Sequence, residues 1–163
     1  KSKIQTFDLE KIYPEGERIA LDISQWLYKG FVVKEKEFRE SLKNHNWEQY
    51  QDQFIALHCS NDAIVPEWAY MLITTYLKDY AQKIIYGSLH ELELMLFNDV
   101  INQIDPEEYR DKPVIIKGCS EKSIPQNAYI QLVQKLQPVV KSMMFGEACS
   151  SVPLYKKPRK PKK

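Results

Sequence analysis

Two stretches of the chain repeat one pattern at a near-constant spacing of 59 residues. The matched pairs are Phe38 and Phe97, Tyr50 and Tyr109, Asp52 and Asp111, Pro66 and Pro125, Ala69 and Ala128, Tyr70 and Tyr129, Leu77 and Leu136, and Gly87 and Gly146. One residue inserted around Pro113 would bring Cys59-Ser60 opposite Cys119-Ser120 at a spacing of 60, and a shorter following loop would restore 59. The pattern predicts a duplication of one helix–strand–helix unit, at about 38–87 and 97–146.

The predicted fold is a single α/β domain with a mostly parallel sheet. Two apolar runs without alternation, 54–57 and 114–116, are typical of strands that helices cover on both faces. Each run precedes a proline, Pro66 or Pro125, that can begin a helix. Periodicity predicts further helices at 35–44 and 89–104, with the second long helix of the repeat ending near Gly146. Residues 18–22 and 31–34 are predicted as short strands, and residues 1–16 as an extended segment.

Composition excludes several classes of protein. Hydrophobic residues make up 44% of the 163 residues, and no apolar run is long enough to span a membrane, so we expect a globular protein without a membrane partner. The last residues are rich in lysine and proline, and we expect a domain at 1–155 followed by a disordered basic tail at 156–163. The tail has no aromatic residue for base stacking, so nucleic acid is not an expected partner.

The three cysteines are the most distinctive residues. An odd number cannot close into disulfides within one chain, which favours a reducing compartment such as the cytoplasm. Each cysteine is followed by serine and then, within a few residues, by Val-Pro or Ile-Pro. The pairs begin at Cys59, Cys119 and Cys149. This recurrence predicts three loops with a shared role.

A metal site is the first interpretation of these loops. Cys59 and Cys119 follow the two predicted strands, and neighbouring strands about 4.8 Å apart would bring their sulfurs toward one ion. Three thiolates suit zinc or an iron–sulfur cluster. His90 is a fourth ligand by repeat symmetry, because it follows Gly87 at the spacing by which Cys149 follows Gly146. His58 and Asp62 are rival fourth ligands.

Two other functions stay open. One cysteine could be the nucleophile of a sulfur-transfer or redox enzyme, with the others resolving it. Alternatively, the cysteines could only pack within a non-catalytic interaction module, since free cysteine is often buried. The chain has no Gly-x-Gly-x-x-Gly, phosphate-binding loop or Gly-x-Ser-x-Gly motif, so nucleotide binding and serine hydrolysis have no support.

The cysteine loops also resemble a known family. The segments 59–72, 117–129 and 146–156, with Phe7-Asp-Leu-Glu10 and 34–39 near the start, are similar to the domain-of-unknown-function family 2480 of Bacteroidetes-type bacteria. The resemblance covers nearly the whole chain up to the tail. The resemblance implies a gene encoded near those of sulfur-mobilisation and iron–sulfur assembly proteins, and iron–sulfur assembly proteins would then be the partners. The family pattern includes Cys59, Cys119 and Cys149. The family has no established activity.

Overall fold

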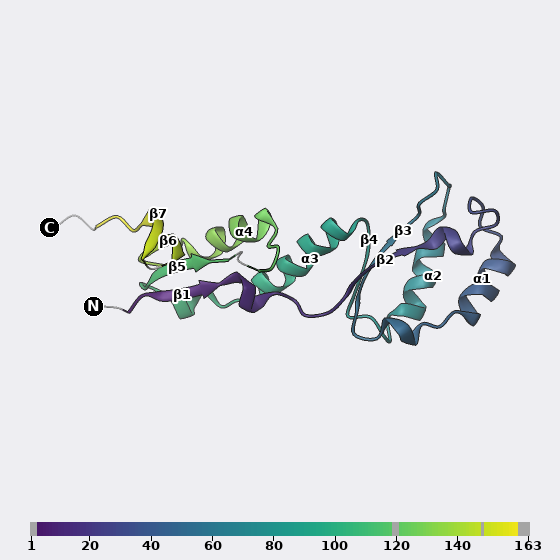
Figure 1. The fold of residues 1–163 in the computed structure, drawn as a ribbon, viewed down its shortest axis with the longest axis horizontal. Coiled ribbons are helices and arrows are strands. Elements are labelled where there is room, and N and C mark those ends of the chain that lie inside the picture. The colour runs from purple at the N-terminus through teal and green to yellow at the C-terminus, as the bar shows by residue number, and fades with distance from the viewer. Residues whose placement is uncertain (1–2, 119–120, 148, 160–163) are drawn as a thin grey trace. The chain divides into compact units, whose positions relative to one another are not determined.

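The computed structural model describes residues 3–118, 121–147 and 149–159. They form two compact units that share one plan. Glu15–Glu93 make the continuous unit, whereas Lys1–Pro14 and Leu94–Lys163 make the split unit. Helix α3 (Leu89–Asn102) begins in the first and ends in the second. Figure 1 shows the order of the elements along the chain.

The continuous unit is built on three parallel strands in the order β2-β3-β4. The strands are β2 (Arg18–Asp22), β3 (Phe54–His58) and β4 (Lys83–Tyr86), and the helices are α1 (Glu35–Asn44) and α2 (Glu67–Leu77). Two short 3-10 helices, η2 (Ile23–Trp26) and η3 (Glu48–Tyr50), complete the unit. Phe38 and Leu42 of α1 and Ala69, Ile73 and Leu77 of α2 pack with Ile55 and Leu57 of β3 in its core.

The split unit repeats this plan with one additional strand. Its sheet has the order β1-β5-β6-β7, from β1 (Gln5–Asp8), β5 (Pro113–Lys117), β6 (Ser142–Glu147) and β7 (Ser150–Lys156). Only the β6–β7 pair is antiparallel. The 3-10 helices η1 (Leu9–Ile12) and η4 (Pro106–Tyr109) and helix α4 (Gln126–Leu136) complete it. Phe97 and Ile101 of α3 and Leu132 and Leu136 of α4 pack on Val114 and Ile116 of β5.

Equivalent backbone contacts confirm the duplication. The backbone N–H of Asp52 donates to the carbonyl of Tyr80 (2.9 Å), and that of Asp111 donates to Val139 (2.8 Å). Both aspartates adopt left-handed backbone conformations, with φ of 59° and 54°, which aspartate tolerates better than most residues. All four of these residues obey the spacing of 59.

The α/β class and the mostly parallel pairing are confirmed, but the strands form two sheets where one was expected. The N-terminal strand β1 pairs with β5, and β2 pairs with β3. In Figure 1 the purple β1 lies beside the green β5, although most of the chain separates them. Each repeat therefore has its own first strand and its own hydrophobic core.

Two details of the predicted elements are wrong. The second helix of each repeat ends at Leu77 or Leu136, and a strand precedes Gly87 and contains Gly146. The chain turns in the same way after both helices: the N–H groups of Tyr80 and Ala81 donate to the Leu77 carbonyl, and those of Val139 and Val140 donate to the Leu136 carbonyl. Residues 31–34 form no strand beyond an isolated bridge between Tyr28 and Val32.

At the other end of the chain, order continues past the predicted domain end at residue 155. Lys156 closes β7, and Lys157 donates to Asp111 through its ammonium group (2.8 Å) and to the Lys141 carbonyl through its backbone N–H (2.9 Å). Residues 160–163 of the predicted basic tail lie outside the described residues.

Candidate functional site

Polar side chains gather at the carboxyl edge of the sheet in the continuous unit. The three parallel strands end at Asp22, His58 and Tyr86, and Asp22 is the register partner of His58. Cys59 follows β3 directly and is half-buried. In parallel α/β sheets this edge is the usual ligand-binding side.

Asp22 stabilises the loop that follows Cys59 through hydrogen bonds. Its Oδ1 accepts hydrogen bonds from the backbone N–H groups of Ser24 (3.0 Å) and Ser60 (3.1 Å). The hydroxyls of Ser24 and Ser60 are 3.2 Å apart and hydrogen-bonded. Burial by itself would raise the pKa of Asp22, but the hydrogen bonds from Ser60 and Ser24 outweigh it and hold that pKa well below its usual range.

A second contact fixes the tip of the same loop. The side-chain amide of Asn61 donates to the carbonyl of Gly30 (2.7 Å), and the Ala63 N–H donates to the Asn61 carbonyl (2.9 Å). The residue after Cys59 and the residue beyond it are therefore both held by hydrogen bonds. These hydrogen bonds hold the backbone directly after the thiol.

Two tyrosines complete the edge. Tyr70 of α2 and Tyr86 of β4 make an edge-to-face contact with ring centroids 5.0 Å apart. Burial, with the negative potential of Tyr86, Cys59 and Asp22, raises the pKa of Tyr70 to about 12. Tyr70 therefore remains a protonated phenol, able to donate a hydrogen bond to an anion at this edge.

The split unit has a different set of residues at the equivalent edge. Lys117 stands where the continuous unit has His58, and it forms an ion pair with Glu147 (2.8 Å) that raises the pKa of Lys117. Gly118 stands in place of Cys59, and a Cβ there would lie 2.7 Å from the Tyr129 hydroxyl. Glu10 holds the following loop by accepting from the N–H groups of Glu121 (2.9 Å) and Lys122 (3.2 Å).

The cysteine loops are therefore not equivalent. Strand register matches Phe54 with Lys83 and Pro113 with Ser142, so the spacing is 59 across strands and flanking helices alike. The residue predicted to be inserted around Pro113 does not exist. The loops have equal length, and Cys59 aligns with Gly118 while Ser60 aligns with Cys119. Cys119 itself lies outside the described residues.

The structural similarity of the repeats does not extend past Gly87 and Gly146 to His90 and Cys149. His90 is exposed in the first turn of α3, which Ser88 and Glu91 begin with reciprocal hydrogen bonds between side chain and backbone N–H (2.6 and 3.1 Å). Cys149 is exposed in the turn between β6 and β7. The two repeats diverge after Gly87 and Gly146, one into a helix and the other into a hairpin.

The predicted metal ligands come from both units. Cys59, His58, Asp62 and His90 belong to the continuous unit, and Cys119 and Cys149 to the split unit. The strands β3 and β5 are not neighbours, so the condition for a close approach of Cys59 and Cys119 across adjacent strands is not met. Among the described residues, no three His, Cys, Asp or Glu side chains form a group able to hold a metal ion.

Sequence reasoning missed Asp22, Ser24 and the role of Tyr70. Asp-x-Ser directly after a predicted strand is typical of a capped turn and could have indicated the first two. The sequence indicated Tyr70 only as the repeat match of Tyr129. Its position near the start of the helix that follows a cysteine loop is the signal that could have indicated its role.

Comparison with known proteins identifies a family but no activity. The family model described as "Protein of unknown function (DUF2480)" matches residues 1–157. No curated protein and no solved structure matches the chain. Within the described residues, no helix combines the length and apolar character required to cross a membrane. Because the model match covers all but the last few residues, the chain belongs to the DUF2480 family.

Proposed function

We propose that the protein performs thiol chemistry at Cys59, as a sulfur-transfer or redox protein. The proposal rests on the arrangement at the carboxyl edge of β2-β3-β4. There a half-buried thiol directly follows a strand, and a hydrogen bond to Asp22 holds the loop after it. A buried and inert packing cysteine would not need this arrangement. The negative charge of a Cys59 thiolate also adds to the raised pKa of Tyr70, after burial and Tyr86.

In the sulfur-transfer form of the proposal, Cys59 acts as the nucleophile. Its thiolate attacks the outer sulfur of a persulfide donor; the donor's S–S bond breaks, a new S–S bond forms on Cys59, and the donor leaves as a thiolate. In this proposal Tyr70 is a positioning residue: its phenol stays protonated and would donate a hydrogen bond to the anionic sulfur. This proposal includes a reducing compartment such as the cytoplasm, which keeps the thiol free. It also includes partners in iron–sulfur assembly, which would use the transferred sulfur.

Mass spectrometry of the reduced protein after treatment with glutathione persulfide tests the proposal. We expect a gain of one sulfur atom on Cys59, lost in Cys59→Ser and slowed in Tyr70→Phe. Cys149→Ser is the matched control, because Cys149 is exposed in a turn. Modification confined to Cys149, or slow modification of all thiols, would overturn the proposal, and the latter would favour packing cysteines in an interaction module.

A second candidate function is binding of zinc or an iron–sulfur cluster by Cys59, Cys119 and Cys149, with His90 as the fourth ligand. The recurrence of Cys-Ser in three loops favours it, although such a site needs ligands from both units. Anaerobic purification followed by iron, sulfide and zinc analysis tests it. Stoichiometric metal that disappears in each single Cys→Ser variant supports this function; absence of metal after anaerobic reconstitution excludes it.

A further inference from the structure

The duplication places one groove at the same position in both units. In the continuous unit it lies between α1 and α2, has a volume of about 390 Å³, and is lined by Glu35, Arg39, Trp68, Met71, Leu72 and Thr75. In the split unit it lies between α3 and α4 with a volume of about 370 Å³. The equivalent lining residues there are Leu94, Asn98, Asn127, Ile130, Gln131 and Gln134, each 59 positions later.

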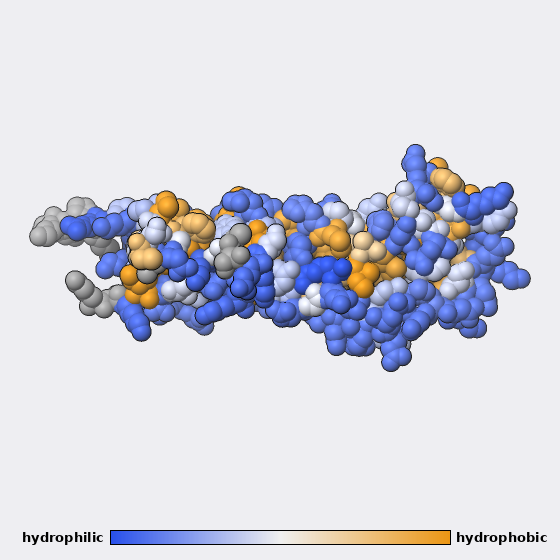
Figure 2. Space-filling model, viewed as in Figure 1, coloured by the Kyte–Doolittle hydropathy of each residue, from blue (hydrophilic) through white to orange (hydrophobic). Residues whose placement is uncertain are grey.

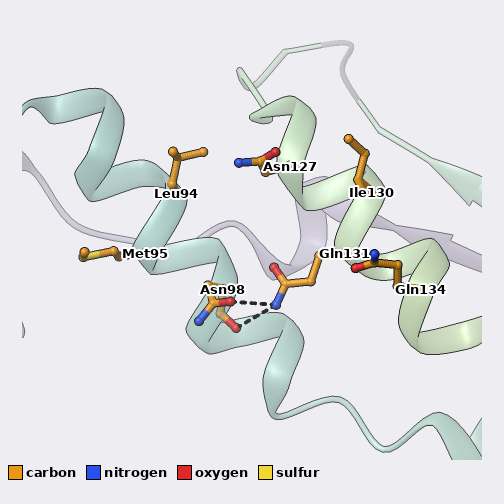
Figure 3. A pocket seen from close by; sticks show the side chains of 7 residues that line it. All are labelled: Leu94, Met95, Asn98, Asn127, Ile130, Gln131 and Gln134. Atoms are coloured by element: carbon orange, nitrogen blue, oxygen red, sulfur yellow. Dashed lines mark hydrogen bonds between the residues drawn. The ribbon is translucent and has the colours of Figure 1, made fainter.

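The two grooves differ in charge. Arg39 pairs with Glu35 (3.1 Å) and its guanidinium lies 5.6 Å from the centre of the Trp68 ring. No charged side chain lines the groove of the split unit, where Gln131 instead donates to the side chain of Asn98 (2.9 Å). Figure 3 shows this hydrogen bond, and Leu94 and Asn127 pointing toward one another across the groove.

A second uncharged hollow continues this surface on the other side of α4. It has a volume of about 690 Å³, shares Ile130 and Gln134 with the first, and reaches Phe145 of β6 and Val152 and Leu154 of β7. In the part of the chain that the structure describes, the split unit has one strand more than the continuous unit, and no helix follows α4 to cover the hollow. Exposed hydrophobic residues interrupt the hydrophilic surface over β6 and β7 in Figure 2.

This combination is unusual for a solvent-exposed surface in a chain with 28% charged residues. Ile130 is 52% exposed and Val152 59% exposed. The only charged residue of α4, Lys135, donates to the carbonyls of Ile101 and Asn102 at the end of α3 (2.9 and 2.7 Å). Depletion of charge around exposed apolar residues is typical of the centre of a protein interface.

We propose that this surface, centred on Ile130, is where a second copy of the chain binds to form a two-fold dimer. In a two-fold dimer, residues next to the axis contact their own symmetry mates, so a charge at the centre of the surface would face a like charge. Amide side chains such as Asn127, Gln131 and Gln134 both donate and accept, and can therefore hydrogen-bond to their own symmetry mates. The uncharged amide and apolar lining thus fits a second copy better than a charged partner.

The test is the mass of the full chain in solution, measured by sedimentation and light scattering over a wide concentration range. We expect a dimer that Ile130→Glu weakens by at least about 30-fold, the effect of losing a central interface residue. Met71→Glu is the matched control, since Met71 is the repeat equivalent of Ile130 and is 65% exposed. It should leave the dimer unchanged.

Two results would overturn the proposal: a wild-type protein that stays monomeric at the highest concentration, or equal weakening by Ile130→Glu and Met71→Glu. Circular dichroism checks that both variants fold. If Ile130→Glu proved unfolded, Asn127→Glu places the charge on an exposed position of the same groove and takes its place. Persistence of the dimer in a folded Asn127→Glu variant would then count against this surface.

Discussion

The continuous and split units have matching cores and different sheet edges. Equivalent buried positions hold Phe38 and Phe97, Leu42 and Ile101, Ile55 and Val114, and Ile73 and Leu132. At the edge, His58-Cys59 of one unit corresponds to Lys117-Gly118 of the other. Packing constrains the core to apolar residues of similar size, whereas side chains at the sheet edge are free of this constraint and can differ in chemistry. A reactive thiol fits only the continuous unit at this position.

The largest effect on stability is expected from substituting the equivalent phenylalanines of the two cores. Phe38 and Phe97 are fully buried, and each makes a contact between aromatic ring centroids 5.8 Å apart, with Trp68 and Tyr13 respectively. We expect Phe38→Ala and Phe97→Ala each to lower the free energy of unfolding by about 3 to 5 kcal/mol. Urea denaturation measures both. If one substitution were nearly neutral, the two cores would not be equivalent.

Substituting the aspartate at the end of the first strand should destabilise the continuous unit more than the split unit. Among the described residues, Asp22 accepts backbone hydrogen bonds from Ser24 and Ser60, whereas Asp8 accepts one from Glu10 (3.0 Å). We expect Asp22→Ala to cost about 1 to 3 kcal/mol and Asp8→Ala about 0.5 to 2 kcal/mol. Equal costs would show that the bond to the cysteine loop contributes nothing.

The cost of Asp22→Ala should also depend on pH. Because folding lowers the pKa of Asp22 below its ordinary value of 3.8, its contribution is present above that pH and is lost as the pH falls through the folded pKa. The stabilities of wild type and Asp22→Ala should therefore converge in acid. Denaturation at a series of pH values measures this, and a difference that widened in acid would contradict it.

A smaller effect is expected from giving the split unit a side chain where the continuous unit has Cys59. Gly118→Ala places a Cβ 2.7 Å from the Tyr129 hydroxyl, so the ring must shift. We expect a loss of about 1 kcal/mol by thermal denaturation. In a Tyr129→Phe background the same substitution should cost less, because the clashing oxygen is gone. If Gly118→Ala cost as much in the Tyr129→Phe background as in the wild type, the Tyr129 hydroxyl would not be the source of the strain.

The smallest expected effect concerns His45, whose repeat equivalent is Ile104. His45 packs against Trp26 and Trp47, with ring centroids 5.1 and 4.7 Å apart, and hydrogen-bonds to the Tyr50 hydroxyl (2.8 Å). Burial lowers the pKa of His45, so stability should fall as the pH drops through 6.5 toward the folded pKa. His45→Ile should remove this slope from melting curves. A slope that survives the substitution would assign it to another group.

The sequence alone determined the parts of the fold that local periodicity encodes. The helix at 35–44, most of α3, the strands at 18–22 and 54–57, and the helix starts after Pro66 and Pro125 were all predicted, because apolar spacing and proline conformation act over a few residues. The duplication was predicted because equivalent core and turn residues face the same constraints in both units.

Only the tertiary structure decided how these parts combine. Pairing of β1 with β5, which divides the strands between two sheets, joins segments that are far apart in the sequence and leaves no local pattern. The alignment of Cys59 with Gly118 depends on strand register, which is set by the partner strand. The hydrogen bond from Ser60 to Asp22 depends on two strands ending side by side. Periodicity along a chain reports which face of an element is buried, but contacts between distant segments decide which side chains meet.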